Sequence, residues 1–263
     1  MKALSVILLV LVLAALGGGG YYFYTTQDAD QEPSTPSAPS SIPVPLTSTT
    51  PSAPVTTKDT GIQEVKSAHF EDSTPAHNEV YAVAPMNIVI NFNFDLADNS
   101  TITIEKGGVD YGSGATILDP NKRSMRRVMK AAPDGIYTVH YTACWPDRSC
   151  HDGTFAFTID STQVSKYEDM TGKAEVAIEL VNTTISPAYI VVSRGTKVTW
   201  MNMDAETHYV NADTHPFHTF FLALNSEALS QNDTFSHTFA DPGEYPYHCS
   251  SHAAEMTGRV VVK

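Results

Sequence analysis

Basic residues are scarce in this chain, and so are cysteines. The 263 residues include 16 lysines and arginines against 29 aspartates and glutamates, which gives a net charge of -13. A nucleic-acid-binding protein needs a basic surface, so this balance argues against nucleic acid as a partner. Three cysteines are too few for a disulfide scaffold or a thiol-rich metal store, and their odd number leaves at least one thiol free, reactive or bound to metal.

The chain is about twice as long as a typical single domain, which predicts two folded units. Its few basic residues include one cluster between positions 122 and 130, which is typical of a solvated face or loop. The cluster consists of Lys122, Arg123, Arg126, Arg127 and Lys130. Because the rest of the chain is acidic, a protein partner that is steered electrostatically should be basic or should dock on a local patch.

The amino-terminal segment indicates where the protein resides. The 22 residues from position 3 to 24 carry no charge. A helix of that length spans roughly 33 Å, enough for a hydrocarbon core of about 30 Å. Lys2 lies on the near side, which orients the rest of the chain outward from the cytoplasmic membrane. A cleaved signal peptide with its cleavage site at residues 15–17 is the alternative. Residues 1–26 are thus expected to be a membrane anchor or signal segment, with the bulk of the chain periplasmic or at the cell surface.

Residues 27–60 are expected to form a disordered linker. Proline, serine and threonine fill 20 of these 34 positions, and large apolar side chains are almost absent. Such a segment cannot bury enough surface to offset its ordering entropy. We interpret it as a spacer between the membrane and the folded units.

Both folded units are predicted to be antiparallel β-sandwiches with little helix. Short stretches alternate polar and apolar residues, and turn sequences such as residues 133–135 separate them. In the first unit, residues 67–160, the expected strands are 87–94, 101–104, 136–139 and 153–159. In the second unit, residues 174–263, they are 176–181, 188–192, 197–200, 235–239, 243–247 and 258–262. The polar stretch 161–173 is the expected boundary.

Soft metal ligands are concentrated near the carboxyl end. Cys249, His252 and Met256 lie within eight positions, and His208 follows the end of an expected strand. A thiolate, two imidazoles and a distant thioether are the trigonal set of a blue-copper electron-transfer site. A rigid β-scaffold suits this use, because it holds a geometry between those that the two oxidation states of copper prefer. The sequence therefore predicts one type 1 copper ion.

Motifs around these residues carry a resemblance to a known family. They are Val198-Thr199-Trp200, Asn202-x-Asp204, Phe235-Ser236-His237-Thr238-Phe239, Pro242-Gly243-x-Tyr245-x-Tyr247-His248-Cys249 and Met256-Thr257-Gly258. In these motifs residues 174–263 resemble a cupredoxin domain of the plastocyanin/azurin superfamily. The resemblance implies that His208, Cys249, His252 and Met256 are the copper ligands. Asn202 is then expected to help hold the ligands in orientation.

Other interpretations of the ligand set are weaker. Zinc is an alternative occupant, but the methionine favours copper, since zinc prefers sites of cysteine, histidine and carboxylate. In the interpretation without a metal, Cys249 is a buried structural cysteine and His252 is a surface residue. A multicopper oxidase needs His-x-His pairs, and a binuclear purple site needs two cysteines in one loop; the sequence has neither.

Three further histidines lie close to the expected ligands in the sequence. His248 precedes Cys249 and should face the opposite side of its strand, which favours packing or surface exposure over metal binding. His215 and His218 lie in the long loop after His208. Three roles are open to them: a surface pair, closure over the site, or capture of a second ion.

The first unit carries shorter motifs: Ser73-Thr74-Pro75-Ala76, Ala84-Pro85-x-x-Ile88-Val89-Ile90-x-Phe92, Gly135-x-Tyr137-Thr138-Val139 and Gly153-x-Phe155-x-Phe157. In these motifs residues 67–160 resemble the CopC-like family of extracytoplasmic copper-resistance domains, which are Greek-key sandwiches. The family's cupric site uses an amino-terminal histidine and an Asp-x-His turn. Here those histidine positions fall on Ser67 and Ser149. A shifted site of His69, Asp147 and His151 is an alternative, but a structural or docking role is favoured.

The two remaining cysteines form an even pair. Cys144 and Cys150 flank a short turn between two expected strands, and an oxidising compartment favours a disulfide. Free thiols and a metal pair are the alternatives.

These features predict a membrane-tethered, monomeric copper protein that transfers single electrons outside the cytoplasm to or from a redox partner protein, without enzymatic turnover. The competing hypothesis, favoured by the CopC-like unit and the extra histidines, is a copper-handling protein that binds and passes on the ion.

Overall fold

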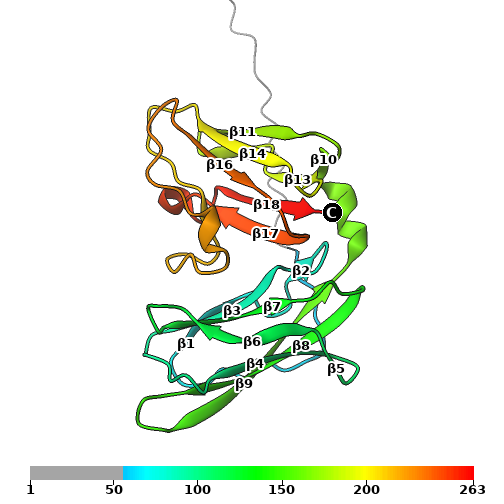
Figure 1. Ribbon diagram of the computed structural model, residues 1–263, viewed down its shortest axis with the longest axis vertical. Helices are drawn as coiled ribbons and strands as arrows, with labels where there is room; N and C mark the ends of the chain where they lie inside the picture. The colour runs from blue at the N-terminus through cyan, green and yellow to red at the C-terminus, as the bar shows by residue number, and fades with distance from the viewer. Residues whose placement is uncertain (1–55) are drawn as a thin grey trace, which may run out of the picture. The chain divides into compact units, whose positions relative to one another are not determined.

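The computed structural model describes residues 56–263, which form two β-sandwiches (Figure 1). The predicted all-β class is confirmed. The expected membrane anchor or signal segment, residues 1–26, and positions 27–55 of the expected linker lie outside the described residues. Within residues 56–263 no helix combines the length and the apolar character needed to cross a bilayer.

The first sandwich consists of two sheets. One has the strand order β1-β3-β7-β6 and the other β2-β9-β8-β4-β5. The strands of the first sheet are β1 (Phe70–Thr74), β3 (Asn87–Phe92), β7 (Ser124–Met129) and β6 (Gly112–Leu118). Those of the second are β2 (Val80–Tyr81), β9 (Cys150–Ile159), β8 (Gly135–Cys144), β4 (Thr101–Lys106) and β5 (Val109–Asp110). Apolar side chains from both sheets, such as Ile104, Phe92 and Phe157, fill the core between them.

Strand β3 differs from the sequence prediction in its burial. The alternation of polar and apolar residues predicts a half-buried strand, yet all six residues of β3 are buried. Ile88, Ile90 and Phe92 face the core of the first sandwich. On the other face, Val89 packs into the core cluster of the second sandwich, and Asn87 donates a hydrogen bond to the Phe220 carbonyl at 2.7 Å. The polar face is therefore an interface and not a solvated surface.

The basic cluster is only partly a solvated loop. Lys122 and Arg123 lie in a loop, as predicted, but Arg126 and Arg127 belong to strand β7. Arg126 forms an ion pair with Asp119, whose side chain is only 2% exposed. Arg127 binds Asp110 and donates to the carbonyl of Ile102. The prediction of a solvated face or loop is wrong for Arg126 and Arg127. Each lies on a strand and is paired with a carboxylate of a neighbouring segment.

The predicted disulfide between Cys144 and Cys150 is confirmed. The two residues are opposite each other where β8 and β9 pair, with their Cα atoms 4.0 Å apart. Cys249 is the remaining cysteine, and it is free and buried.

The second sandwich also has two sheets, with the strand orders β10-β13-β18-β17-β15 and β12-β11-β14-β16. The first sheet contains β10 (Glu168–Asp169), β13 (Tyr189–Val192), β18 (Thr257–Val262), β17 (Gly243–His248) and β15 (Asn211–Ala212). The second contains β12 (Thr184–Ser186), β11 (Glu175–Val181), β14 (Lys197–Asn202) and β16 (Thr234–Thr238). The predicted antiparallel arrangement is wrong for part of this sandwich, because β11 pairs with β14, and β13 with β18, in parallel. Short 3-10 helices occur at η1 (Ser161–Lys166), η2 (Leu222–Leu224) and η3 (Ser250–His252).

The core of the second sandwich is built around large aromatic side chains. Strand β11 alternates exposed and buried residues, as a strand with one solvated face does. Trp200 on β14 is fully buried and contacts the ring of Tyr247 on β17, with ring centroids 5.4 Å apart. Strands β17 and β18 pair in antiparallel register from Gly243–Val262 to His248–Thr257. This hairpin fixes both ends of the segment that carries Cys249, His252 and Met256.

A buried ionic cluster joins residues of the two sandwiches. Arg259 on β18 pairs with Glu79 of the first sandwich and, at 2.7 Å, with Glu244 on β17. The side chains of the three residues are 6%, 8% and 0% exposed. Burial by itself lowers the pKa of Arg259, but the charges of Glu79 and Glu244 outweigh it and raise that pKa well above its usual value. Burial also raises the pKa of Glu79, against the opposing charge of Arg259.

The loop between β15 and η2 is held by the first sandwich. Thr214 donates to Asp72 Oδ1 at 2.7 Å, and Asn91 on β3 donates to the Thr214 hydroxyl at 3.0 Å. Thr219 donates to Asn91 Oδ1 at 3.0 Å. These side-chain hydrogen bonds fix the conformation of the loop that contains His215 and His218.

Candidate metal centre

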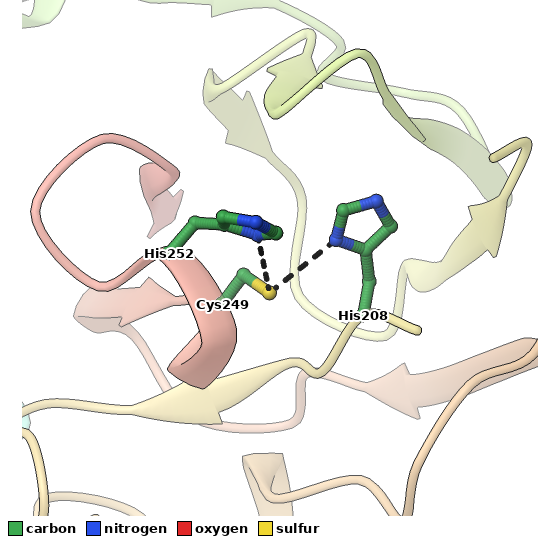
Figure 2. A group of neighbouring side chains, drawn as sticks. All are labelled: His208, Cys249 and His252. Atoms are coloured by element: carbon green, nitrogen blue, oxygen red, sulfur yellow. Dashed lines mark hydrogen bonds between the residues drawn. The ribbon is translucent and has the colours of Figure 1, made fainter. Parts of the chain in front are cut away.

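Three of the four predicted ligands meet in one pocket of the second sandwich (Figure 2). His208 lies in the segment after β14, Cys249 directly follows β17, and His252 ends the short helix η3. Cys249 Sγ is 3.5 Å from Nδ1 of His208 and 3.9 Å from Nδ1 of His252. Their potential ligand atoms all lie within 4.8 Å of one another. Figure 2 shows both imidazoles turned toward the sulfur.

The pocket is almost closed to solvent. Cys249 and His208 are fully buried. His252 is the exception, with 23% of its side chain exposed. One imidazole edge thus reaches the surface while the sulfur does not.

Met256, the fourth predicted ligand, is fully buried in the same core cluster as Cys249. Its carbonyl accepts a hydrogen bond of 2.9 Å from the Cys249 amide, and its own amide donates to the carbonyl of His252 at 2.9 Å. These two backbone bonds tie Met256 to both of the other ligands in the loop.

A carboxylate orients His208. Asp204 Oδ2 lies 2.9 Å from Nε2 of His208, so the ring nitrogen away from Cys249 is anchored. A carboxylate behind a ligating imidazole fixes the tautomer and makes the ligand nitrogen more basic. The sequence motif contained Asp204, but sequence reasoning gave it no role. The signal that could have found it is the four-residue spacing from the expected ligand.

Asn202 has the supporting role that the sequence predicts. It is fully buried at the end of β14. Its amide donates to the carbonyls of Glu206 at 2.6 Å and Leu229 at 2.8 Å, and its oxygen accepts from the Asp204 amide at 2.8 Å. His208 and Leu229 also exchange two backbone hydrogen bonds. The conformation of the segment before His208 is therefore set by hydrogen bonds of residues that are not among the predicted ligands.

The sulfur has a backbone donor. The amide of Tyr209 donates to Cys249 Sγ at 3.4 Å. A donor in this place stabilises negative charge on the sulfur, which is the form that binds metals.

Comparisons with known proteins match each sandwich separately. Residues 172–263 match the family of copper binding proteins, plastocyanin/azurin family. Residues 70–160 match the CopC domain. The chain contains a CopC domain followed by a plastocyanin/azurin-type copper-binding domain. Copper is the metal to which this family assignment points.

Individual relatives cover one domain at a time. Amicyanin of Paracoccus denitrificans is 28% identical over 88 residues, which are 34% of this chain and 65% of that protein. A novel purple cupredoxin from Nitrosopumilus maritimus is 28% identical, covers 34% of this chain and 99% of its own, and has a TM-score of 0.30. CopC from Methylosinus trichosporium OB3b is 20% identical over 36% of this chain and 94% of its own, with a TM-score of 0.33. The chain thus spans just under two thirds of the amicyanin that it matches.

The donor set of the plastocyanin/azurin-type domain fits copper. A thiol and two imidazoles converge in a buried pocket, and a thioether lies in the same loop. This combination of soft and borderline donors is the one that a blue-copper site uses, whereas closed zinc sites are built from cysteine, histidine and carboxylate.

The alternative shifted site in the CopC domain does not form. Among the described residues, His69, Asp147 and His151 are not part of any group of potential metal ligands. His69 is stacked on Phe94 and its Nδ1 is 2.9 Å from Asn93 Oδ1. Asp147 accepts hydrogen bonds from its neighbour Ser149. These side chains are occupied by local contacts.

His215 and His218 do not join the group of Cys249. They gather instead with His248, which is buried as the packing interpretation expected. Burial lowers the pKa of His218 to about 4, and the nearby His248 and His215 add to the effect. His218 is therefore uncharged in the folded protein at neutral pH.

This shift predicts a pH dependence of stability for the metal-free protein. Below the ordinary pKa of 6.5 the unfolded chain binds a proton at His218, but the folded chain does not until the pH nears 4. The free energy of unfolding should therefore fall as the pH is lowered from about 6.5 to about 4. In urea unfolding with a chelator present, His218→Gln should show a smaller decrease over this range. His140→Gln, at an exposed position, is the control, and equal slopes for wild type and His218→Gln would contradict the assignment.

Proposed function

We propose that this chain is a membrane-tethered blue-copper protein that carries single electrons outside the cytoplasm. His208, Cys249, His252 and Met256 are its ligands for one type 1 copper ion. The observation that carries this proposal is the convergence of the Cys249 sulfur and two imidazole nitrogens, with His208 already anchored by Asp204. Bound copper supplies the chemistry by alternating between its two oxidation states, one electron at a time.

The arrangement suits an electron carrier because residues outside the ligand set hold it in place. Hydrogen bonds of Asn202, Asp204 and Tyr209 hold the ligand loops, so little rearrangement is needed when the charge of the ion changes. The partly exposed His252 is the edge at which electrons enter and leave. A redox protein that docks over His252 is the proposed partner, and the acidic chain favours a basic one. Residues 1–26 supply the membrane tether, and the chain acts as a monomer.

Visible absorption and electron paramagnetic resonance spectra of the full chain loaded with Cu(II) test the proposal. We expect an intense visible absorption that disappears on reduction, together with the small copper hyperfine splitting of a type 1 site. A colourless protein that binds Cu(II) through nitrogen and oxygen alone would refute it.

A second candidate function is the handling of copper, in which the protein binds the ion and passes it on. The match of residues 70–160 to the CopC domain favours it. Retention of copper separates the two functions. A carrier should keep its visible absorption through repeated reduction and oxidation in the presence of a modest copper chelator, because its buried ligands do not exchange. A handling protein should lose the ion to the chelator within the first cycles.

A further inference from the structure

A second group of imidazoles lies next to the candidate copper site. It consists of His215 and His218, from the loop between β15 and η2, and His248, the last residue of β17. The ring centroids are 5.5 Å apart for His215 and His218, 5.6 Å for His215 and His248, and 5.1 Å for His218 and His248. One ligand atom from each residue can be chosen so that all three lie within 4.8 Å of one another. Three rings thus form a nearly equilateral group.

The two ring nitrogens of His248 have different surroundings, and one of them is suited to bind a metal. Its Nδ1 lies 2.8 Å from Asp213 Oδ1, which is the carboxylate–histidine arrangement found behind metal ligands. Its Nε2 is buried and has no hydrogen-bond partner among residues 56–263. The side chain is 3% exposed, so solvent does not replace the missing partner. A buried polar atom without a partner destabilises the folded protein, and a bound metal ion would supply the missing partner.

Hydrogen bonds hold the ring of His218 and the loop that carries His215. His218 Nε2 lies 3.0 Å from the hydroxyl of Ser250, and its carbonyl accepts a hydrogen bond from Asn225 at 2.9 Å. The segment that leads from β15 to His215 is fixed by a hydrogen bond from the Thr214 hydroxyl to Asp72 of the CopC domain. The CopC domain therefore helps to shape this group, although its own residues are not part of it.

We propose that His215, His218 and His248 bind a second metal ion, and that this ion is Cu(II). Three imidazoles and no thiolate are a donor set for Zn, Cu, Fe or Ni, and among divalent ions of this row Cu²⁺ binds such ligands most strongly. The carboxylate of Asp213 contacts His248 and offsets part of the charge of a divalent ion. Because the group contains no sulfur, the second copper adds little to the visible absorption. This site does not depend on the proposed electron-carrier function.

The copper content of the full chain tests the site. The protein is incubated with excess Cu(II), passed through a desalting column, and examined by elemental analysis and electron paramagnetic resonance. We expect two copper ions per chain and two signals, one of type 1 and one with the large hyperfine splitting of an ordinary Cu(II) site. His215→Ala should bind one copper ion, lose only the second signal and keep the intense visible absorption. His215 is exposed, so its replacement leaves the core intact.

Two further variants complete the test. The double variant His215→Ala, His218→Ala should also bind one copper ion, and His140→Ala, at an exposed position in the CopC domain, should still bind two. The proposal is overturned if the wild type lacks the Cu(II) signal with the large hyperfine splitting, or if that signal persists in the double variant and so arises elsewhere; loss of the type 1 signal alone would count against the electron-carrier function and not against this site. With Cu(II) and Zn(II) supplied in equal amounts, zinc as the second ion would overturn the assignment to copper.

Discussion

Replacing Cys249 with serine is expected to abolish the intense visible absorption of the copper-loaded protein. In the proposed site the absorption arises from charge transfer between the cysteine sulfur and copper, and a serine oxygen does not supply it. Cys249 is also the one free cysteine among the described residues, so no other thiol of this part of the chain can replace it. The band should be lost completely, because it depends on a single bond.

Asp204→Ala is the matched comparison for this prediction. Asp204 contacts His208 from behind and is not itself a ligand. Its removal should keep the colour at saturating copper but lower the copper affinity by about 10–100-fold, the usual effect of removing such a support. A Cys249→Ser protein that still absorbs as the wild type does would show that the sulfur is not bonded to the metal.

The variant Arg259→Met is expected to lower the free energy of unfolding by about 3–5 kcal/mol, because it leaves two buried carboxylates without their positive partner. Glu244 is fully buried and Glu79 nearly so. Backbone amides of Ala82 and Val83 also donate to Glu244, but they supply no positive charge. Urea unfolding of the metal-free protein at neutral pH measures this loss.

A surface ion pair provides the control for Arg259. Arg123 and Asp95 are 3.2 Å apart with more than half of each side chain exposed, so Arg123→Met should cost less than about 1 kcal/mol. Adding Glu79→Gln and Glu244→Gln to Arg259→Met should recover much of the lost stability, since no uncompensated charge is then buried. Equal and small losses for the Arg259 and Arg123 variants would contradict the expected contribution of the buried ionic cluster.

The sequence allowed prediction of ten strands, four in the first sandwich and six in the second, and of the disulfide, because alternation and paired cysteines are local signals. It did not predict β1, β6 or the shortest strands. It also pointed to Cys249 and His252, which lie on one loop between two paired strands and must therefore stay close. His208 comes from a different segment, which follows β14, and it was pointed to by the family resemblance; the structure brings the three residues together. It did not reveal the strand at Ser124–Met129, which is only partly buried and whose Arg126 and Arg127 give the segment a polar character.

The second imidazole group shows the limit of such reasoning. His248 was expected to face away from Cys249, but nothing in the sequence places residues 215 and 218 beside it. Their position depends on the path of a long loop, and that path is set by hydrogen bonds to Asp72 and Asn91, more than a hundred residues earlier in the chain. Likewise the burial of strand β3 follows from a contact between domains, which has no periodic signature.

Strand β17 ends in two neighbours that serve different groups: His248 belongs to the three imidazoles, and Cys249 to the candidate copper site. The two residues share one peptide unit, so a small movement of the backbone at His248 also moves the backbone at Cys249. If an ion bound to His248 shifted this backbone, the position of the Cys249 sulfur would shift with it. The wavelength of the visible absorption band should therefore depend on whether His215, His218 and His248 hold an ion.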